Sequence, residues 1–123
     1  MLKWDPGEFK KKLISELVEN GEIVGKFVES DARQRLLKIS DPEWGKGHRN
    51  YVSRLLTNVV ETERNAVVIK IGLPPGKTTK EGKQTRHLGF YIEMGDSHHA
   101  AHPYLRPAVF ANAAKIVRLL SGK

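Results

Sequence analysis

The sequence predicts an α+β domain in which a long N-terminal helix and a C-terminal helix pack on a small antiparallel β-sheet. Apolar residues recur at helical spacing near both ends of the chain, β-branched residues cluster in its middle, and glycine and proline separate these segments. The 123 residues, 39% of them hydrophobic, suffice for one modest core. Residues 1–123 are therefore expected to form a single domain.

The first element is predicted as a helix over about residues 6–39. Asp5 is a suitable N-cap, and Pro6 takes the first helical position. Apolar side chains then recur on one face of the helix, namely Phe9, Leu13, Leu17, Val24 and Val28. The pair Asn20-Gly21 is typical of a turn, so a break into two helices is the alternative. A continuous helix would let another backbone approach closely at Gly21 and Gly25.

The middle of the chain is predicted as a β-hairpin over about residues 55–73. Pro42 ends the preceding helix in a loop, and residues 51–56 are interpreted as a helical turn or an irregular strand. A polar turn over residues 61–65 then separates the two strands of the hairpin. The second strand contains the β-branched residues Val67, Val68, Ile69 and Ile71.

The last third of the chain is expected to contain a loop, a strand and a helix. Residues 73–87 hold two prolines, two glycines and almost no apolar side chains, which predicts a long flexible basic loop. Residues 88–94, Leu-Gly-Phe-Tyr-Ile-Glu-Met, are interpreted as a third strand. Pro107 is suited to begin a final helix over residues 107–121.

The charge of the chain is unevenly distributed. The net charge is +7, from 21 basic and 14 acidic side chains. Residues 1–44 carry a net −1 and residues 45–123 a net +8. Such a basic surface attracts a polyanion or an acidic protein face, but it does not specify which. The absence of cysteine excludes a disulfide framework, and no apolar run approaches the roughly 20 residues that span a bilayer.

No motif in the sequence predicts a catalytic residue, a metal site or a cofactor. His98, His99 and His102 are spaced like metal ligands, but Pro103 disfavours a helix there and no acidic partner motif accompanies them. They are interpreted as exposed loop histidines. The Gly-Lys-Thr at residues 76–78 resembles the end of a phosphate-binding loop, but two prolines precede it and no helix pattern follows. The chain is therefore expected not to be an enzyme.

The basic loop has two interpretations. Four of its cations recur every third residue, at Lys77, Lys80, Lys83 and Arg86. In an extended segment they would contact successive phosphates, which would suit a small basic nucleic-acid-binding protein. No aromatic side chains for base stacking lie among them, so simple solvation or docking to another protein is the alternative.

The most specific segments lie near the C-terminus. They are Phe-Tyr-Ile-Glu-Met-Gly-Asp at residues 90–96 and His-Pro-Tyr-Leu-Arg-Pro-Ala at residues 102–108, before an amphipathic helix. Both resemble the neck or minor tail-component family of lambdoid siphophages, in which a strand ending in a glutamate, a hydrophobic residue and glycine precedes Pro-hydrophobic-Leu-Arg-Pro-Ala and a last helix. The layout of most of the chain is similar, while the specific likeness covers about residues 90–110.

The resemblance implies a non-enzymatic virion protein that acts in head–tail joining, in the neck or in tail completion. Such a protein would be assembled in the host bacterial cytoplasm and located at the head–tail junction or tail. Its partners would be other copies of itself and the connector, head-completion and tail proteins, with DNA close by and no membrane. The alternative function is the small basic nucleic-acid-binding protein.

The same segments supply the candidate interface residues. They are Glu93, Pro103, Tyr104, Leu105, Arg106 and Pro107. The two prolines fix φ near −65° and so limit the freedom of the residues between them. Glu93 and Arg106 are interpreted either as an intramolecular salt bridge or as a partner contact. The aromatic side chains of Phe90, Tyr91 and Tyr104 either complete the core or belong to an interface.

Overall fold

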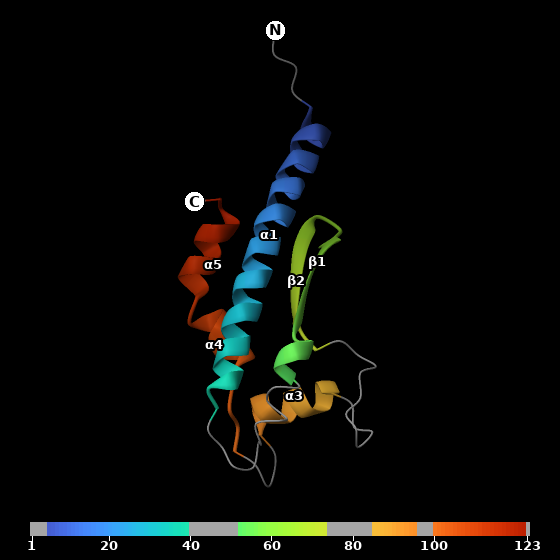
Figure 1. Ribbon diagram of the computed structural model, residues 1–123. Coiled ribbons are helices and arrows are strands. Elements are labelled where there is room, and N and C mark those ends of the chain that lie inside the picture. The colour runs from blue at the N-terminus through green and yellow to red at the C-terminus, as the bar shows by residue number, and fades with distance from the viewer. Residues whose placement is uncertain (1–4, 40–51, 74–84, 96–99, 123) are drawn as a thin grey trace.

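The structure is a computed structural model that describes residues 5–39, 52–73, 85–95 and 100–122. Its elements are α1 (Pro6–Leu37), β1 (Thr57–Glu63), β2 (Ala66–Gly72), α3 (Thr85–Met94), α4 (Leu105–Phe110) and α5 (Ala113–Leu120). A single helical turn over residues 52–55 precedes β1. The predicted α+β class is confirmed, with helices predominating. In Figure 1, α1 lies between the β1–β2 hairpin and the pair formed by α4 and α5.

Helix α1 is unbroken over its 32 residues. The carboxylate of Asp5 accepts hydrogen bonds from the N–H groups of Gly7 (2.9 Å) and Glu8 (3.3 Å), as an N-cap does. All buried residues of α1 lie from Gly21 onward, whereas its first turns are largely exposed. The helix therefore contributes to the core mainly through its C-terminal half.

The hairpin pairs antiparallel from Thr57 opposite Gly72 to Glu63 opposite Ala66. One face of it packs on α1 at the two glycines. A Cβ on Gly21 would lie 3.4 Å from Val60, and one on Gly25 would lie 2.6 Å from Oδ1 of Asn58. The atoms that approach these two glycines most closely thus belong to side chains of the hairpin and not to another backbone. This close packing offsets the low helix propensity of glycine.

The core is a single cluster along α1. Its four α1 side chains, Val24, Val28, Ala32 and Leu36, are at most 3% exposed. The other elements complete it with Val52, Leu56, Ile92, Tyr104 and Ala108. Arg33 ties the helical turn to α1, because its guanidinium donates to the carbonyls of Ser53 (2.9 Å) and Leu56 (3.2 Å).

The strand predicted over residues 88–94 is wrong, because these residues belong to α3. The sheet that the structure describes has only the two strands of the hairpin. Ile92 and Glu93 are neighbours in sequence and are both buried, at 0% and 6% exposed. A strand would direct consecutive side chains to opposite faces, whereas a helix keeps Gly89, Ile92 and Glu93 on one side. Tertiary packing therefore overrides the aromatic, strand-like composition.

The single helix predicted over residues 107–121 is also corrected. The structure has α4 and α5, separated at Ala111 and Asn112. The side-chain amide of Asn112 donates to the carbonyl of Ala108 (2.8 Å), and its backbone N–H turns to Val109 (3.3 Å). In an unbroken α-helix the backbone N–H of Asn112 would donate to the Ala108 carbonyl. Here the Asn112 side chain donates to that carbonyl instead, and the helix is interrupted. The same amide donates to Asp31 of α1 (3.1 Å), which fixes the break against the long helix.

The predicted flexible loop over residues 73–87 falls mostly outside the described residues. Residues 74–84 are not described, and residues 85–87 form the first turn of α3 instead of loop. The candidate cations Lys77, Lys80 and Lys83 therefore lie outside the described part of the chain. Arg86 lies on α3, and only its backbone is described.

Candidate functional site

The candidate site is built around one carboxylate at the start of α4. Oε1 of Glu93 accepts hydrogen bonds from the backbone N–H groups of Tyr104 (3.0 Å) and Leu105 (2.7 Å), and Oε2 accepts from that of Arg106 (3.4 Å). Tyr104 is the N-cap residue of α4, and its own side chain makes no capping bond. Since Pro107 has no N–H, Glu93 of α3 satisfies every amide N–H from the N-cap through the third helical residue.

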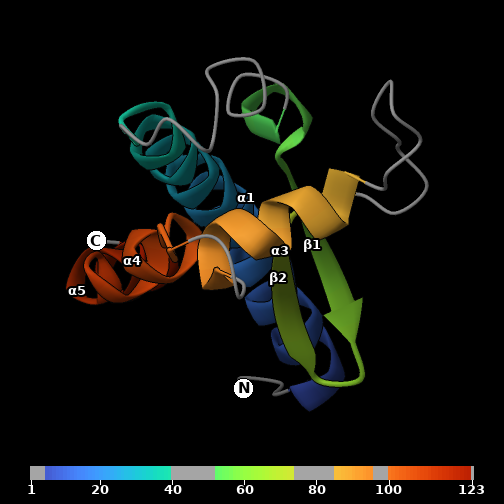
Figure 2. The same cartoon turned by 90° about the horizontal axis from the view of Figure 1, so that it is seen from below.

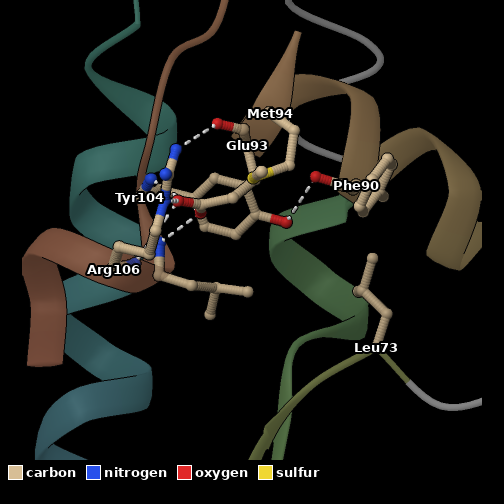
Figure 3. A pocket seen from close by; sticks show the side chains of 8 residues that line it. Leu73, Phe90, Glu93, Met94, Tyr104 and Arg106 are labelled. Atoms are coloured by element: carbon tan, nitrogen blue, oxygen red, sulfur yellow. Dashed lines mark hydrogen bonds and ion pairs between the residues drawn. The ribbon is translucent and has the colours of Figure 1, made fainter.

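Arg106 completes this arrangement, which we call the Glu93 network. Its Nε donates to Oε2 of Glu93 at 2.9 Å, and its second guanidinium nitrogen donates to the Glu93 carbonyl at 3.0 Å. The carboxylate side chain is only 8% exposed, whereas that of Arg106 is 48% exposed. Glu93 of α3 therefore binds both the backbone N–H groups of residues 104–106 and the side chain of Arg106 (Figure 3).

Tyr104 fixes the other side of the segment. Its ring is 1% exposed, and its hydroxyl donates to the carbonyl of Gly89 at 3.1 Å. A Cβ on Gly89 would collide with Leu73 and would lie 2.8 Å from the Tyr104 hydroxyl, so glycine is required at this position in α3. The backbone also closes the connection, because the N–H of His102 donates to the carbonyl of Ile92 at 2.7 Å.

The network changes the protonation behaviour of Glu93. Burial by itself would raise the pKa of the carboxyl, but the hydrogen bonds from Leu105, Arg106 and Tyr104 favour the charged form and lower the pKa below its usual value of 4.5. Burial, and secondarily the negative charge of Glu93, raises the pKa of Tyr104. Near neutral pH the site therefore contains an ionised carboxylate and a neutral phenol, both already hydrogen-bonded.

Beside the Glu93 network lies an open groove of about 290 Å³. Its apolar wall includes Phe90 and Met94 of α3, which are 57% and 48% exposed. Figure 3 shows these two side chains and Leu73 around Tyr104. The full lining is Leu73, Gly89, Phe90, Glu93, Met94, Tyr104, Leu105 and Arg106. The groove thus offers an apolar surface on a rigid base.

The polar groups of the Glu93 network are already engaged with one another. The two oxygens of Glu93 already accept four hydrogen bonds, and its lowered pKa makes it a weak base. The Tyr104 hydroxyl is buried and donates to a carbonyl. What the site presents outward is the exposed Pro103, Arg106 and Phe90, with Leu105 and Pro107 half-buried.

The six candidate interface residues are thus brought together, in different roles. Of the two interpretations of Glu93 and Arg106, the structure contains the intramolecular ion pair, although Glu93 lies on a helix and not on a strand. Tyr104 belongs to the core, whereas Phe90 is exposed, and the side chain of Tyr91 lies outside the described residues. Sequence reasoning missed Gly89 and Ile92, although their spacing with Glu93 is that of one helical face.

The other candidates of the sequence analysis contribute little to this site. His98 and His99 lie outside the described residues, and His102 is half-buried. Among the residues that the structure describes, no group of three or more metal-ligating side chains is found. Within the same residues, no helix combines the length and apolarity that a membrane span requires.

Comparisons with known proteins identify no relative of this chain. No protein-family model, curated protein or solved structure matches the chain.

Proposed function

We propose that this chain is a non-enzymatic structural protein of a tailed-phage virion, acting in head–tail joining, in the neck or in tail completion. The observation that carries the proposal is the Glu93 network. It holds the Pro-Tyr-Leu-Arg-Pro segment, which resembles the phage family, beside an exposed apolar groove. A segment that is already ordered loses little conformational entropy when a partner binds, which favours specific docking.

The binding surface in this proposal combines two kinds of group. Phe90 and Met94 supply apolar area, and the exposed guanidinium of Arg106 retains donors beyond those that Glu93 uses. Aromatic residues, methionine and arginine are enriched in protein–protein interfaces. The partners would be other copies of the chain and the connector, head-completion and tail proteins around it.

The direct test is the protein content of purified phage particles. Intact virions of the source phage would be digested with trypsin and searched for the peptide Leu55–Arg64, which lies between two cleavable arginines. We expect this peptide at several copies per particle. Its absence from particles that contain other low-copy neck proteins would overturn the proposal.

A matched pair of variants tests the groove as the docking surface. Phe90→Glu places a charge in the groove, whereas Val117→Glu places the same charge on α5, at a side chain that is 65% exposed. We expect particles grown with the first variant to lose the protein and those grown with the second to retain it. Equal incorporation of both variants would exclude the groove as the docking surface.

The alternative, a nucleic-acid-binding protein, makes a different prediction. Its affinity for DNA would fall steeply with salt and would drop when Lys77, Lys80, Lys83 and Arg86 are neutralised. An assembly protein would show neither effect. Absence from virions together with salt-dependent DNA binding would favour this alternative.

A further inference from the structure

Within the part of the chain that the structure describes, the hairpin forms a sheet of two strands, and no described strand pairs with the outer edge of either one. β1 and β2 pair along seven residues each, from Thr57 opposite Gly72 to Glu63 opposite Ala66, without a bulge. In such an antiparallel ladder, every second residue directs its N–H and C=O away from the partner strand. Within the described residues, no hydrogen bond outside the ladder uses a backbone N–H of either strand.

These edges are held in a fixed shape by the rest of the molecule. The inner face of the hairpin packs on α1, where Val60 and Ile69 lie over Gly21. Asn58 donates to Glu29 of α1 at 3.1 Å. Ordered strand edges can pair with another strand, and neither strand contains proline to prevent it. Figure 2 shows the hairpin on the flank of α1, away from α4 and α5.

The charges on the outer face indicate which edges fit each other. β1 carries Glu61 and Glu63, both exposed, and β2 carries the exposed Lys70. Two β1 edges side by side would oppose carboxylates, and two β2 edges would oppose ammonium groups. A β1 edge beside a β2 edge would instead place the carboxylates of one copy near the lysine of the next.

We propose that copies of this chain associate edge to edge, with β1 of one copy pairing antiparallel with β2 of the next. The two edges of one copy differ, so the contact is heterologous, and its repetition gives a closed ring or an open filament. Copies arranged around one axis all point the same way, so β2 of each copy runs antiparallel to β1 of its neighbour. This edge pairing rests on the proposed function, which names other copies of the chain as partners.

The test uses two charge variants, each of which should assemble poorly alone, whereas a mixture of the two should assemble. Lys70→Glu makes both edges acidic, and the double variant Glu61→Lys/Glu63→Lys makes both basic. The wild-type chain is expected to form an oligomer, with its mass measured by light scattering after gel filtration. Each variant alone should assemble only at a protein concentration at least about tenfold higher than the wild type needs, because like charges then oppose each other. An equimolar mixture should restore the wild-type assembly.

Controls separate this effect from unfolding and from net charge. A variant that is merely destabilised is not rescued by mixing, and thermal unfolding of each variant checks the fold. Lys26→Glu and Glu19→Lys/Glu22→Lys make the same charge changes at exposed positions of α1 and should leave assembly unchanged. A wild-type chain that is monomeric at the highest concentration reached, variants with wild-type mass, or a mixture that is not rescued would each overturn the inference.

The result is distinguishable from a failure of the proposed function. Rescue by mixing combined with absence from virions would retain the edge pairing and reject the phage role. Presence in virions combined with failure of the mixing experiment would retain the phage role and reject the edge pairing.

Discussion

Two ion pairs in this molecule have the same length and very different surroundings. Glu93 and Arg106 join α3 to α4 at 2.9 Å, and Glu61 and Lys70 join the two strands of the hairpin at 2.9 Å. The carboxylate side chain is 8% exposed in the first pair and 47% exposed in the second. Glu93 also accepts three backbone hydrogen bonds, whereas within the described residues the carboxylate of Glu61 contacts only the ammonium group of Lys70.

The comparison shows that distance alone does not give the strength of an ion pair. The exposed carboxylate keeps most of its water, so its loss changes little. The buried carboxylate has exchanged water for four protein donors, and those donors lose their partner when it is removed. The Glu93–Arg106 pair therefore stabilises the monomer. The Glu61–Lys70 pair contributes little to the monomer, and its exposed charges can contact another copy.

Among the variants that remove a polar contact, the largest effect is expected from Glu93→Ala. It leaves three backbone N–H groups and a guanidinium without their acceptor, so we expect the free energy of unfolding to fall by about 3 kcal/mol. Urea denaturation measures this. Glu61→Ala is the matched control and should leave the denaturation midpoint unchanged. Equal losses for the two variants would contradict the distinction between the pairs.

The buried pair should also make stability depend on pH. The pKa of Glu93 is lower in the folded chain than in the unfolded one, so its contribution is complete above the unfolded value of 4.5. It is lost as the pH falls from there through the lower folded pKa. Denaturation curves between neutral pH and pH 3 should show this loss in the wild type and a flatter profile in Glu93→Gln. Identical profiles would argue against an ionised Glu93.

The contact of the hairpin with α1 is tested by a pair of glycine variants. Gly25→Ala forces Asn58 to move and weakens its bond to Glu29, so we expect a loss of about 1–2 kcal/mol. Gly21→Ala meets Val60 only at ordinary contact distance and gains helix propensity, so it should be neutral or stabilising. Thermal unfolding compares the two. Similar shifts in both would mean that the hairpin lies farther from α1.

A smaller loss is expected from Tyr104→Phe. The variant keeps the buried ring and removes the hydroxyl that donates to Gly89, which should lower the free energy of unfolding by about 1 kcal/mol. Tyr104→Ala is the contrasting variant, since it also opens a cavity and should cost about 3–5 kcal/mol. An unchanged midpoint for Tyr104→Phe would mean that the hydrogen bond adds nothing net.

The smallest change in monomer stability is expected from Lys70→Ala. Both members of its ion pair are exposed, so the thermal midpoint of the dilute monomer should not shift measurably. Self-association should nevertheless weaken, because one edge loses the charge that faces the carboxylates of the next copy. A clear loss of stability would instead place the Glu61–Lys70 pair among the contacts that hold the monomer together.

The sequence predicted the elements whose signals are local. Asp5 and Pro6 marked the start of α1, and the β-branched run at Val67–Ile69 marked the hairpin. Residues 88–94 were misassigned because their aromatic composition suits a strand, while the helix is required by contacts of Glu93 with residues about eleven to thirteen positions away. The break at Asn112 depends on Asp31, 81 residues away, which no local pattern reveals.

The structure brings the six candidate interface residues together, but in a geometry that the sequence did not predict. Glu93 and Arg106 were interpreted either as an intramolecular salt bridge or as a partner contact, and the structure contains the intramolecular pair. The role of the carboxylate as a cap for α4 was not foreseen, because it depends on α3 being a helix. The interior position of Tyr104 and the groove beside it follow from the same rearrangement.

Hydrogen exchange of the isolated chain tests the distinction between the two regions most directly. The amide protons of Tyr104, Leu105 and Arg106 should exchange slowly, because Glu93 accepts from all three within the monomer. Every second amide along β1 and β2 should exchange fast in dilute solution and become protected when copies assemble. Fast exchange at residues 104–106, or full protection of both strand edges in the monomer, would contradict this account.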